Sequence, residues 1–178
     1  MILKVNDTVV LREIELSHAL PIFKIIDSQR SYLGKWLPFV DETKSVADVE
    51  AFISAVISAP KAYFEHVFTI WKTDVLVGLV SFKNTDLRDK KTEIGYWLSK
   101  DHQGEGIMTQ SVKTLCHFAF NEQLLNRIEI KCALENHSSI AIAKKLGFCF
   151  EGVQRQGEFI SEGLYRDLNV YSLLRSEY

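Results

Sequence analysis

Hydrophobic and polar positions follow two rhythms along the chain, one typical of helices and one typical of strands. Apolar residues three or four positions apart predict helices over residues 17–28, 45–59, 106–121 and 138–146. Short runs rich in β-branched and aromatic residues predict strands over residues 8–13, 64–71, 75–82, 93–98, 127–133, 149–159 and 164–174. This order of elements, without a repeat or a flexible linker, predicts one mixed α/β domain over residues 1–178.

Several residues mark where the predicted helices begin and end. Ser17 is placed to cap the first helix, and Pro21 is tolerated there because it falls near the first turn. Ser45 and Asp48 form the Ser-x-x-Asp pattern of a capping box. Gly147 is placed as the left-handed C-terminal cap of the last helix.

The segments between the helices and strands also carry a pattern. Residues 32–41 (YLGKWLPFVD) indicate an aromatic loop or a broken helix. Residues 72–74 predict a short turn between two strands, and residues 161–163 predict the turn of a closing hairpin. A polar loop is expected between the strand that ends at Phe82 and the strand that begins at Glu93.

Composition narrows the class of protein. Of the 178 residues, 47% are hydrophobic, which suits a domain with a sizeable core. The formal net charge is −2 and no basic block is present, so we expect neither nucleic acid nor a membrane surface as a partner. No apolar run approaches the roughly 20 residues that span a bilayer, and the N-terminus lacks the apolar core of a signal peptide. We therefore expect a cytoplasmic protein.

The three cysteines are Cys116, Cys132 and Cys149, and none has the spacing of a metal ligand or a CxxC motif. We expect free, mostly buried thiols and no metal site.

The segment Gln103–Met108 (QGEGIM) is the strongest candidate for a binding loop. It follows a predicted strand and opens a predicted helix, so unpaired backbone amides and the positive end of the helix meet at one place. That arrangement favours a phosphate group, although a plain strand–helix turn would also use glycine. No GxxxxGK[ST] motif is present, and the dinucleotide fingerprint lacks its third glycine.

The loop resembles motif A of the GNAT N-acetyltransferase superfamily, Gln/Arg-x-x-Gly-x-Gly/Ala, through Gln103 and Gly106, with Met108 departing from the last small residue. Residues 136–148 (NHSSIAIAKKLGF) resemble the next family motif, Asn-x-x-Ser before a helix that ends in Leu-Gly-Phe. The resemblance covers nearly the whole chain. Within the family, the chain is most similar to the RimJ/RimL branch, nearest to the RimL type, whose members acetylate the α-amino group of ribosomal proteins.

The resemblance implies an α/β (mixed α+β) GNAT fold with a central, mostly antiparallel sheet, splayed between its fourth and fifth strands and covered by helices on both faces. It implies acetyl-CoA as co-substrate, with the pyrophosphate on the amides of the loop. Pantetheine is expected between the strand of residues 93–98 and the strand of residues 127–133. The cofactor-binding residues implied are Trp97, Leu98, Gln103, Gly104, Gly106, Ile107, Met108, Thr109 and Asn136.

Acetyl transfer to an amine needs a base for the ammonium proton and donors for the oxyanion and the leaving thiolate. The resemblance implies Ser139 as general acid and a backbone amide near Leu98 as the carbonyl donor. Glu158 is the expected base, with Glu93 or water as alternatives. A purely structural role also stays open for these residues. Ser139 could simply satisfy backbone amides in the first turn of its helix, and Glu158 and Glu93 could be ordinary exposed strand carboxylates, because both situations are common.

The identity of the acetyl acceptor is the least determined part of the expected function. The RimJ/RimL branch implies a protein N-terminus, that of a ribosomal protein, and suggests a homodimer. The alternatives are a small amine, such as a polyamine, an amino acid or an aminoglycoside, or an acyl-CoA-binding sensor without turnover. The aromatic residues 32–39 either line the acceptor pocket or belong to the core.

Overall fold

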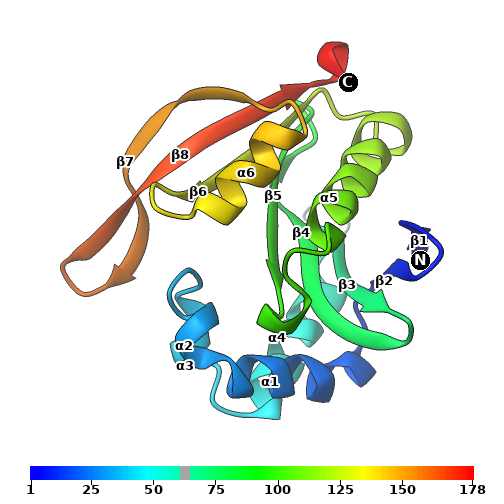
Figure 1. Ribbon diagram of the computed structural model, residues 1–178, viewed down its shortest axis with the longest axis vertical. Helices are drawn as coiled ribbons and strands as arrows, with labels where there is room; N and C mark the ends of the chain where they lie inside the picture. Colours follow the sequence, from blue (N-terminus) through cyan, green and yellow to red (C-terminus); the bar gives the residue numbers. More distant parts are fainter. Residues whose placement is uncertain (61–64) are drawn as a thin grey trace. The chain divides into compact units, whose positions relative to one another are not determined.

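The computed structural model describes residues 1–60 and 65–178 (Figure 1). Its contacts divide the chain into two compact units. The first unit comprises residues 1–82 and 96–114, and the second comprises residues 83–95 and 115–178. The predicted start of a strand at Phe64 lies outside the described residues.

Eight strands pair in the order β1-β2-β3-β4-β5-β6-β8-β7. Neighbouring strands from β1 to β4 and from β6 to β8 and β7 run antiparallel, whereas β5 and β6 run parallel. The mixed, mostly antiparallel sheet expected from the sequence is therefore confirmed. The strands are β1 Ile2–Lys4, β2 Val9–Glu13, β3 Val67–Lys72, β4 Val75–Asp86, β5 Lys91–Leu98, β6 Arg127–Ala133, β7 Cys149–Ser161 and β8 Leu164–Leu174.

The parallel pairing of β5 with β6 is short. It joins Lys91, Thr92 and Glu93 to Arg127, Ile128 and Glu129, although β5 runs on to Leu98 and β6 to Ala133. Pairing that is confined to one end of two strands is consistent with the splay that the family fold requires.

The predicted helices are present, with short additions. A 3-10 turn over Leu16–His18 precedes the first helix, and a π-type turn over Phe118–Glu122 follows α5. The predicted break within residues 32–41 is confirmed, since two four-residue helices occupy this region. The helices are α1 Ala19–Ser28, α2 Arg30–Leu33, α3 Phe39–Glu42, α4 Val46–Ser58, α5 Ile107–His117 and α6 His137–Lys145.

The core of the first unit forms where α1 and α4 turn their apolar faces toward each other and toward β3 and β4. Ile22 and Ile26 lie one helical turn apart on α1, and Val49 and Ile53 lie likewise on α4. All four side chains are buried. The start of α4 is secured by Asp48, whose carboxylate accepts the backbone N–H of Ser45 at 2.8 Å, as the capping pattern predicts.

The core of the second unit follows the alternation predicted for residues 127–133. Ile128, Ile130 and Cys132 of β6 are buried, while the residues between them are half-buried. Helix α6 lies against β6 in Figure 1 and adds the buried Ala143. Gly147 ends α6 with a φ of 80°, in the left-handed region, as predicted.

Three details differ from the sequence-based expectation. Ser17 does not cap α1, because it lies inside the 3-10 turn, where its hydroxyl donates to Glu15 Oε1 at 2.8 Å. Strand β1 was not predicted, because its three residues are too few to show an alternating pattern. The expected polar loop before Glu93 is shorter than predicted, because β4 continues through polar residues to Asp86. Pairing within the sheet overrides the weak strand preference of these residues.

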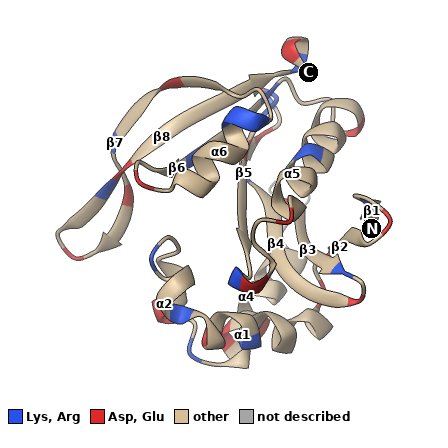
Figure 2. Ribbon diagram, in the orientation of Figure 1, with Lys and Arg blue, Asp and Glu red and all other residues tan. Residues whose placement is uncertain are grey.

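Charges are interspersed in both units. Figure 2 shows acidic and basic segments scattered along the ribbon, without a long block of either kind. Across the described parts of the chain, no helix is both long and apolar enough to cross a bilayer.

Candidate active site

The predicted phosphate loop lies between a 3-10 turn over Lys100–His102 and the start of α5. Gly104 and Gly106 have φ values of 78° and 75°, which a residue with a side chain rarely adopts. A Cβ on Gly104 would meet nothing within 4 Å, and one on Gly106 would meet only Gln110 Nε2 at 3.7 Å. The glycines are therefore needed for the shape of the turn, and the space around them is open on the protein side.

The side chain of Gln29, the C-cap residue of α1, binds the segment that precedes this loop. Gln29 accepts the backbone N–H of Lys100 at 2.8 Å and donates to Ser99 Oγ at 2.9 Å and Asp101 Oδ2 at 3.1 Å. Gln103 in turn donates to the hydroxyl of Tyr32. The segment that precedes the loop is thus tied to the helical region at residues 29–32, which is distant in sequence.

The loop also carries an acidic residue, Glu105, whose negative charge is paired with a lysine. Glu105 forms an ion pair with Lys72, at the end of β3, and its other oxygen lies 3.4 Å from His102 Nδ1. Hydrogen bonding to Lys72 lowers the pKa of Glu105, so this carboxyl is ionised. A phosphate in the loop would lie near this negative charge, and Lys72 offsets it.

Among the other cofactor residues expected, Ile107 and Met108 have buried side chains. Trp97 is also buried, and Leu98 is half-buried at the end of β5. Gly78 of β4 approaches this end closely, because a Cβ there would lie 2.4 Å from the Trp97 carbonyl oxygen. Thr109 is half-buried in the first turn of α5.

In the second unit, the family motif at α6 has the geometry of a helix cap. Asn136 Oδ1 accepts the backbone N–H of Ser139 at 3.2 Å, so Asn136 is the N-cap of α6. Ser139 is buried, and its side chain hydrogen-bonds to that of Cys132 on β6. Burial raises the pKa of the Cys132 thiol, and the bond from Ser139 opposes that rise. A hydroxyl and a thiol therefore meet at the start of α6.

Glu158 is half-buried on β7, opposite Arg166 of β8. Arg166 Nη1 lies 3.3 Å from Glu158 Oε2. Burial raises the pKa of Glu158, while the positive charges of Arg166 and Lys83 oppose the rise and Glu93 adds to it. A carboxylate with a raised pKa is a better proton acceptor than an ordinary one.

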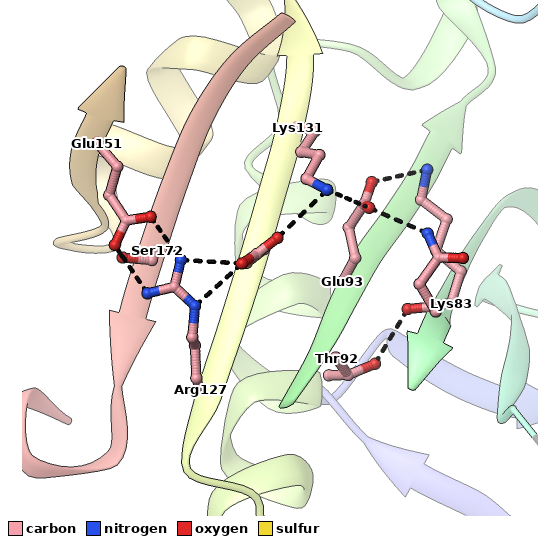
Figure 3. Close-up of polar contacts among 9 residues, drawn as sticks. Lys83, Thr92, Glu93, Arg127, Lys131, Glu151 and Ser172 are labelled. Atoms are coloured by element: carbon pink, nitrogen blue, oxygen red, sulfur yellow. Dashed lines mark hydrogen bonds and ion pairs between the residues drawn. The ribbon is translucent and has the colours of Figure 1, made fainter. Parts of the chain in front are cut away.

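Glu93, the alternative base, is held in a different way (Figure 3). Its side chain is buried, and Lys83 Nζ lies 2.8 Å from Oε1. Lys131 Nζ lies 3.5 Å from Oε2, and Asn84 donates to the same oxygen at 3.3 Å. Both carboxylate oxygens of Glu93 are therefore occupied by neighbouring side chains. This occupancy favours Glu158 over Glu93 as the candidate base.

The network continues across β6, β8 and β7. Arg127 of β6 contacts Glu151 of β7 at 2.5 Å and Glu129 at 2.9 Å, and Ser172 of β8 donates to Glu151 at 2.7 Å. Figure 3 shows these side chains in a row that leads to Lys131 and Glu93. The row ties the outer strands of the second unit to the strand that carries Glu93.

Sequence reasoning missed Gln29, Lys72, Arg166 and Cys132 as parts of these arrangements. No local signal marks them, because each acts on a residue brought close by the fold rather than by the sequence. In the described residues, no group of three or more His, Cys, Asp or Glu side chains is arranged to hold a metal ion.

Comparison with known proteins gives a consistent answer. Residues 8–149 match the family described as an acetyltransferase (GNAT) domain. The chain is 31% identical over 170 residues to the ribosomal-protein-serine acetyltransferase of Escherichia coli (strain K12), which covers 96% of this chain and 94% of that protein. It is 33% identical over 190 residues to the putative ribosomal N-acetyltransferase YdaF of Bacillus subtilis (strain 168), with 98% and 96% covered.

A solved structure agrees over the full length. RimL, the ribosomal L7/L12 alpha-N-protein acetyltransferase in complex with coenzyme A, has a TM-score of 0.93 and 26% identity, with 100% of each chain covered. The mixed, mostly antiparallel sheet is the one that the resemblance implies. This chain belongs to the GNAT family of acetyl-CoA-dependent N-acetyltransferases.

Proposed function

We propose that residues 1–178 act as one acetyltransferase domain that moves the acetyl group of acetyl-CoA to the N-terminal α-amino group of a ribosomal protein. The observation that carries this proposal is the full-length similarity to a ribosomal-protein-serine acetyltransferase. The second support is the fold shared with RimL, a protein solved with coenzyme A.

The proposed cofactor site uses backbone more than side chains. The amides of Gln103, Gly104, Gly106, Ile107, Met108 and Thr109 would donate to the pyrophosphate at the start of α5. The backbone of Trp97 and Leu98 would bind pantetheine, and Asn136 would contact the cofactor while it caps α6. The open space around the two glycines supports the first of these roles.

The proposed chemistry assigns one proton transfer to each of two side chains. Glu158 accepts a proton from the acceptor's ammonium group, and the free amine attacks the thioester carbon. A backbone amide near Leu98 donates to the oxyanion. The carbon–sulfur bond then breaks, and Ser139 Oγ donates its proton to the leaving thiolate. The attacking nitrogen releases its second proton as the neutral amide forms, and this proton restores the hydroxyl of Ser139. The raised pKa of Glu158 and the burial of Ser139 support these roles.

Thiol release from acetyl-CoA, followed over a panel of acceptors, tests the proposal. The panel contains N-terminal peptides of ribosomal proteins, polyamines, amino acids and aminoglycosides. We expect turnover on a Ser-starting peptide, and a loss on the order of 10²–10⁴-fold in Glu158→Gln, as for removal of a general base. Ser139→Ala is expected to lower kcat as well.

Other outcomes separate the alternatives. Turnover on a small amine alone would retain the cofactor site and reject the ribosomal acceptor. Tight binding of acetyl-CoA without turnover on any acceptor would favour a sensor.

A further inference from the structure

The strand that carries Glu158 is interrupted immediately before this residue. Gln154 pairs with Leu168 of β8, and the next pair is Glu158 with Arg166. Between these pairs β7 advances four residues while β8 advances two, so β7 contains a bulge of two extra residues. Bulges bend the strand, increase its twist and redirect the side chains that follow. In Figure 1, β7 and β8 twist strongly around each other along this hairpin.

The bulge needs support because its backbone is unusual. Gln156 has a φ of 50°, in the left-handed region that is disfavoured for a residue with a side chain. Its backbone N–H cannot join the regular ladder and instead donates to Asp167 Oδ1 at 2.7 Å. A bond from an amide to a carboxylate is short and strong compared with a neutral one.

A second contact, between Gly157 of the bulge and Leu168, packs the bulge against β8. A Cβ on Gly157 would lie 2.9 Å from the side chain of Gln154 and 3.2 Å from Leu168 Cδ1. Leu168 is buried and has little room to move. Three successive residues of β8 therefore contact the bulged segment: Leu168 packs under Gly157, Asp167 binds the amide of Gln156, and Arg166 pairs with Glu158.

We propose that Asp167 is a positioning residue, which holds the bulge of β7 and thereby aims the carboxylate of Glu158. The proposal rests on the proposed role of Glu158 as the base. Asp167 binds backbone rather than the acceptor or the cofactor, so it acts on the rate only through Glu158.

The test compares Asp167→Ala with Asp167→Asn in the full chain, using thiol release with the acceptor that gives turnover. Asp167→Ala removes the acceptor oxygen, and a loss of kcat on the order of tenfold is expected if the lost bond is that of a charged group. The KM for acetyl-CoA is expected to stay unchanged. Asp167→Asn keeps an acceptor oxygen without the charge and should give an intermediate kcat, which preserves the test if the alanine variant does not fold.

A double variant separates positioning from general damage. In a Glu158→Gln background the residue to be aimed is gone, so adding Asp167→Ala should cause no further loss of residual activity. An equal loss in both backgrounds, or a wild-type kcat in Asp167→Ala, would overturn the proposal. Full activity in Glu158→Gln alone would instead reject the proposed base, which is a different result. Circular dichroism melting of each variant confirms that the compared proteins are folded.

Discussion

At the scale of single residues, the two carboxylates weighed as the base have opposite environments. Glu93 is buried and bound by Lys83, Lys131 and Asn84, whereas Glu158 is half-buried with one arginine at 3.3 Å. The same residue type thus has both carboxylate oxygens occupied in one place and is less enclosed in the other. Their sequence neighbourhoods do not reveal this difference.

The raised pKa of Glu158 predicts an acid limb in the activity profile. The proposed base must be ionised to accept a proton, so kcat should fall as the pH falls through the pKa of Glu158, which burial places above the ordinary 4.5. Arg166 opposes this rise, so Arg166→Met should move the limb to higher pH. The pH dependence of kcat measures the shift, with the exposed Arg88→Met as a control. A limb at lower pH in Arg166→Met would contradict the prediction.

The ion pair at the phosphate loop predicts a compensating pair of substitutions. Lys72→Met leaves Glu105 unneutralised beside the proposed phosphate site, so acetyl-CoA should bind roughly two- to fivefold more weakly, as for a partly exposed charge pair. Adding Glu105→Gln should restore the affinity. Calorimetric titration with acetyl-CoA measures both variants, and Lys4→Met, which alters another exposed ion pair, is the control. Weaker binding in the double variant than in Lys72→Met would contradict the explanation.

At the scale of elements, the proposed cofactor contacts lie at the ends of strands and at the starts of helices. The end of β5 lies close to Gly78 of β4, the start of α5 follows the glycine turn, and the start of α6 is capped by Asn136. Element ends leave backbone groups unpaired, and these groups are what a phosphate or a thioester carbonyl can use.

The close approach of Gly78 to the end of β5 predicts that a side chain at this position would destabilise the protein. In Gly78→Ala the new Cβ would lie 2.4 Å from the Trp97 carbonyl oxygen, so β4 and β5 must move apart. We expect a loss of about 1–3 kcal/mol in the free energy of unfolding and weaker binding of acetyl-CoA. Urea unfolding and calorimetric titration measure the two effects. Val75→Ala, at an exposed position of the same strand, should change neither, and an unchanged Gly78→Ala would show that the approach is not tight.

The bond between β6 and β7 predicts a pH-dependent contribution to stability. Hydrogen bonding to Arg127 lowers the pKa of Glu151 to about 2 from 4.5. The stabilisation is therefore complete above pH 4.5 and is lost as the pH falls through about 2. Because Glu151 is substantially exposed, its size should be below about 1 kcal/mol. Glu151→Gln should lower the free energy of unfolding at neutral pH and have a much smaller effect below pH 2, where Glu151 is protonated in both states. An equal effect at both pH values would contradict the assignment.

At the scale of the whole molecule, the β7–β8 hairpin exposes large apolar side chains. Phe150, Val153 and Phe159 of β7 and Leu164 and Tyr165 of β8 are each about half exposed. β7 is also the last strand of the sheet, and exposed edges of this kind are typical of interaction surfaces. This surface supports the homodimer suggested by the family branch.

Light scattering after size-exclusion chromatography measures the oligomeric state. The wild-type chain should have the mass of two copies, and Phe159→Glu should shift it toward one copy, because a charge on an apolar interface opposes association. Lys4→Glu, which places the same charge on an exposed residue of β1, should leave the mass unchanged. A wild-type mass of one copy would reject the dimer.

The sequence alone determined the family and the order of the elements, apart from short ones such as β1. Hydrophobic spacing is local, so the strand over residues 127–133, the α4 capping residue Asp48 and the α6 end at Gly147 were all predictable. The glycine loop was equally visible, because the φ values that it needs are available to few other residues.

The tertiary structure decided what surrounds each candidate residue. Gln29 and Lys100 are far apart in the sequence, and so are Lys72 and Glu105, yet each pair is bonded. The bulge before Glu158 depends on a carboxylate of the neighbouring strand, which no local pattern in β7 announces. Secondary structure follows from neighbours along the chain, whereas burial, charge and aim depend on neighbours in space, and these arise only when the strands pair.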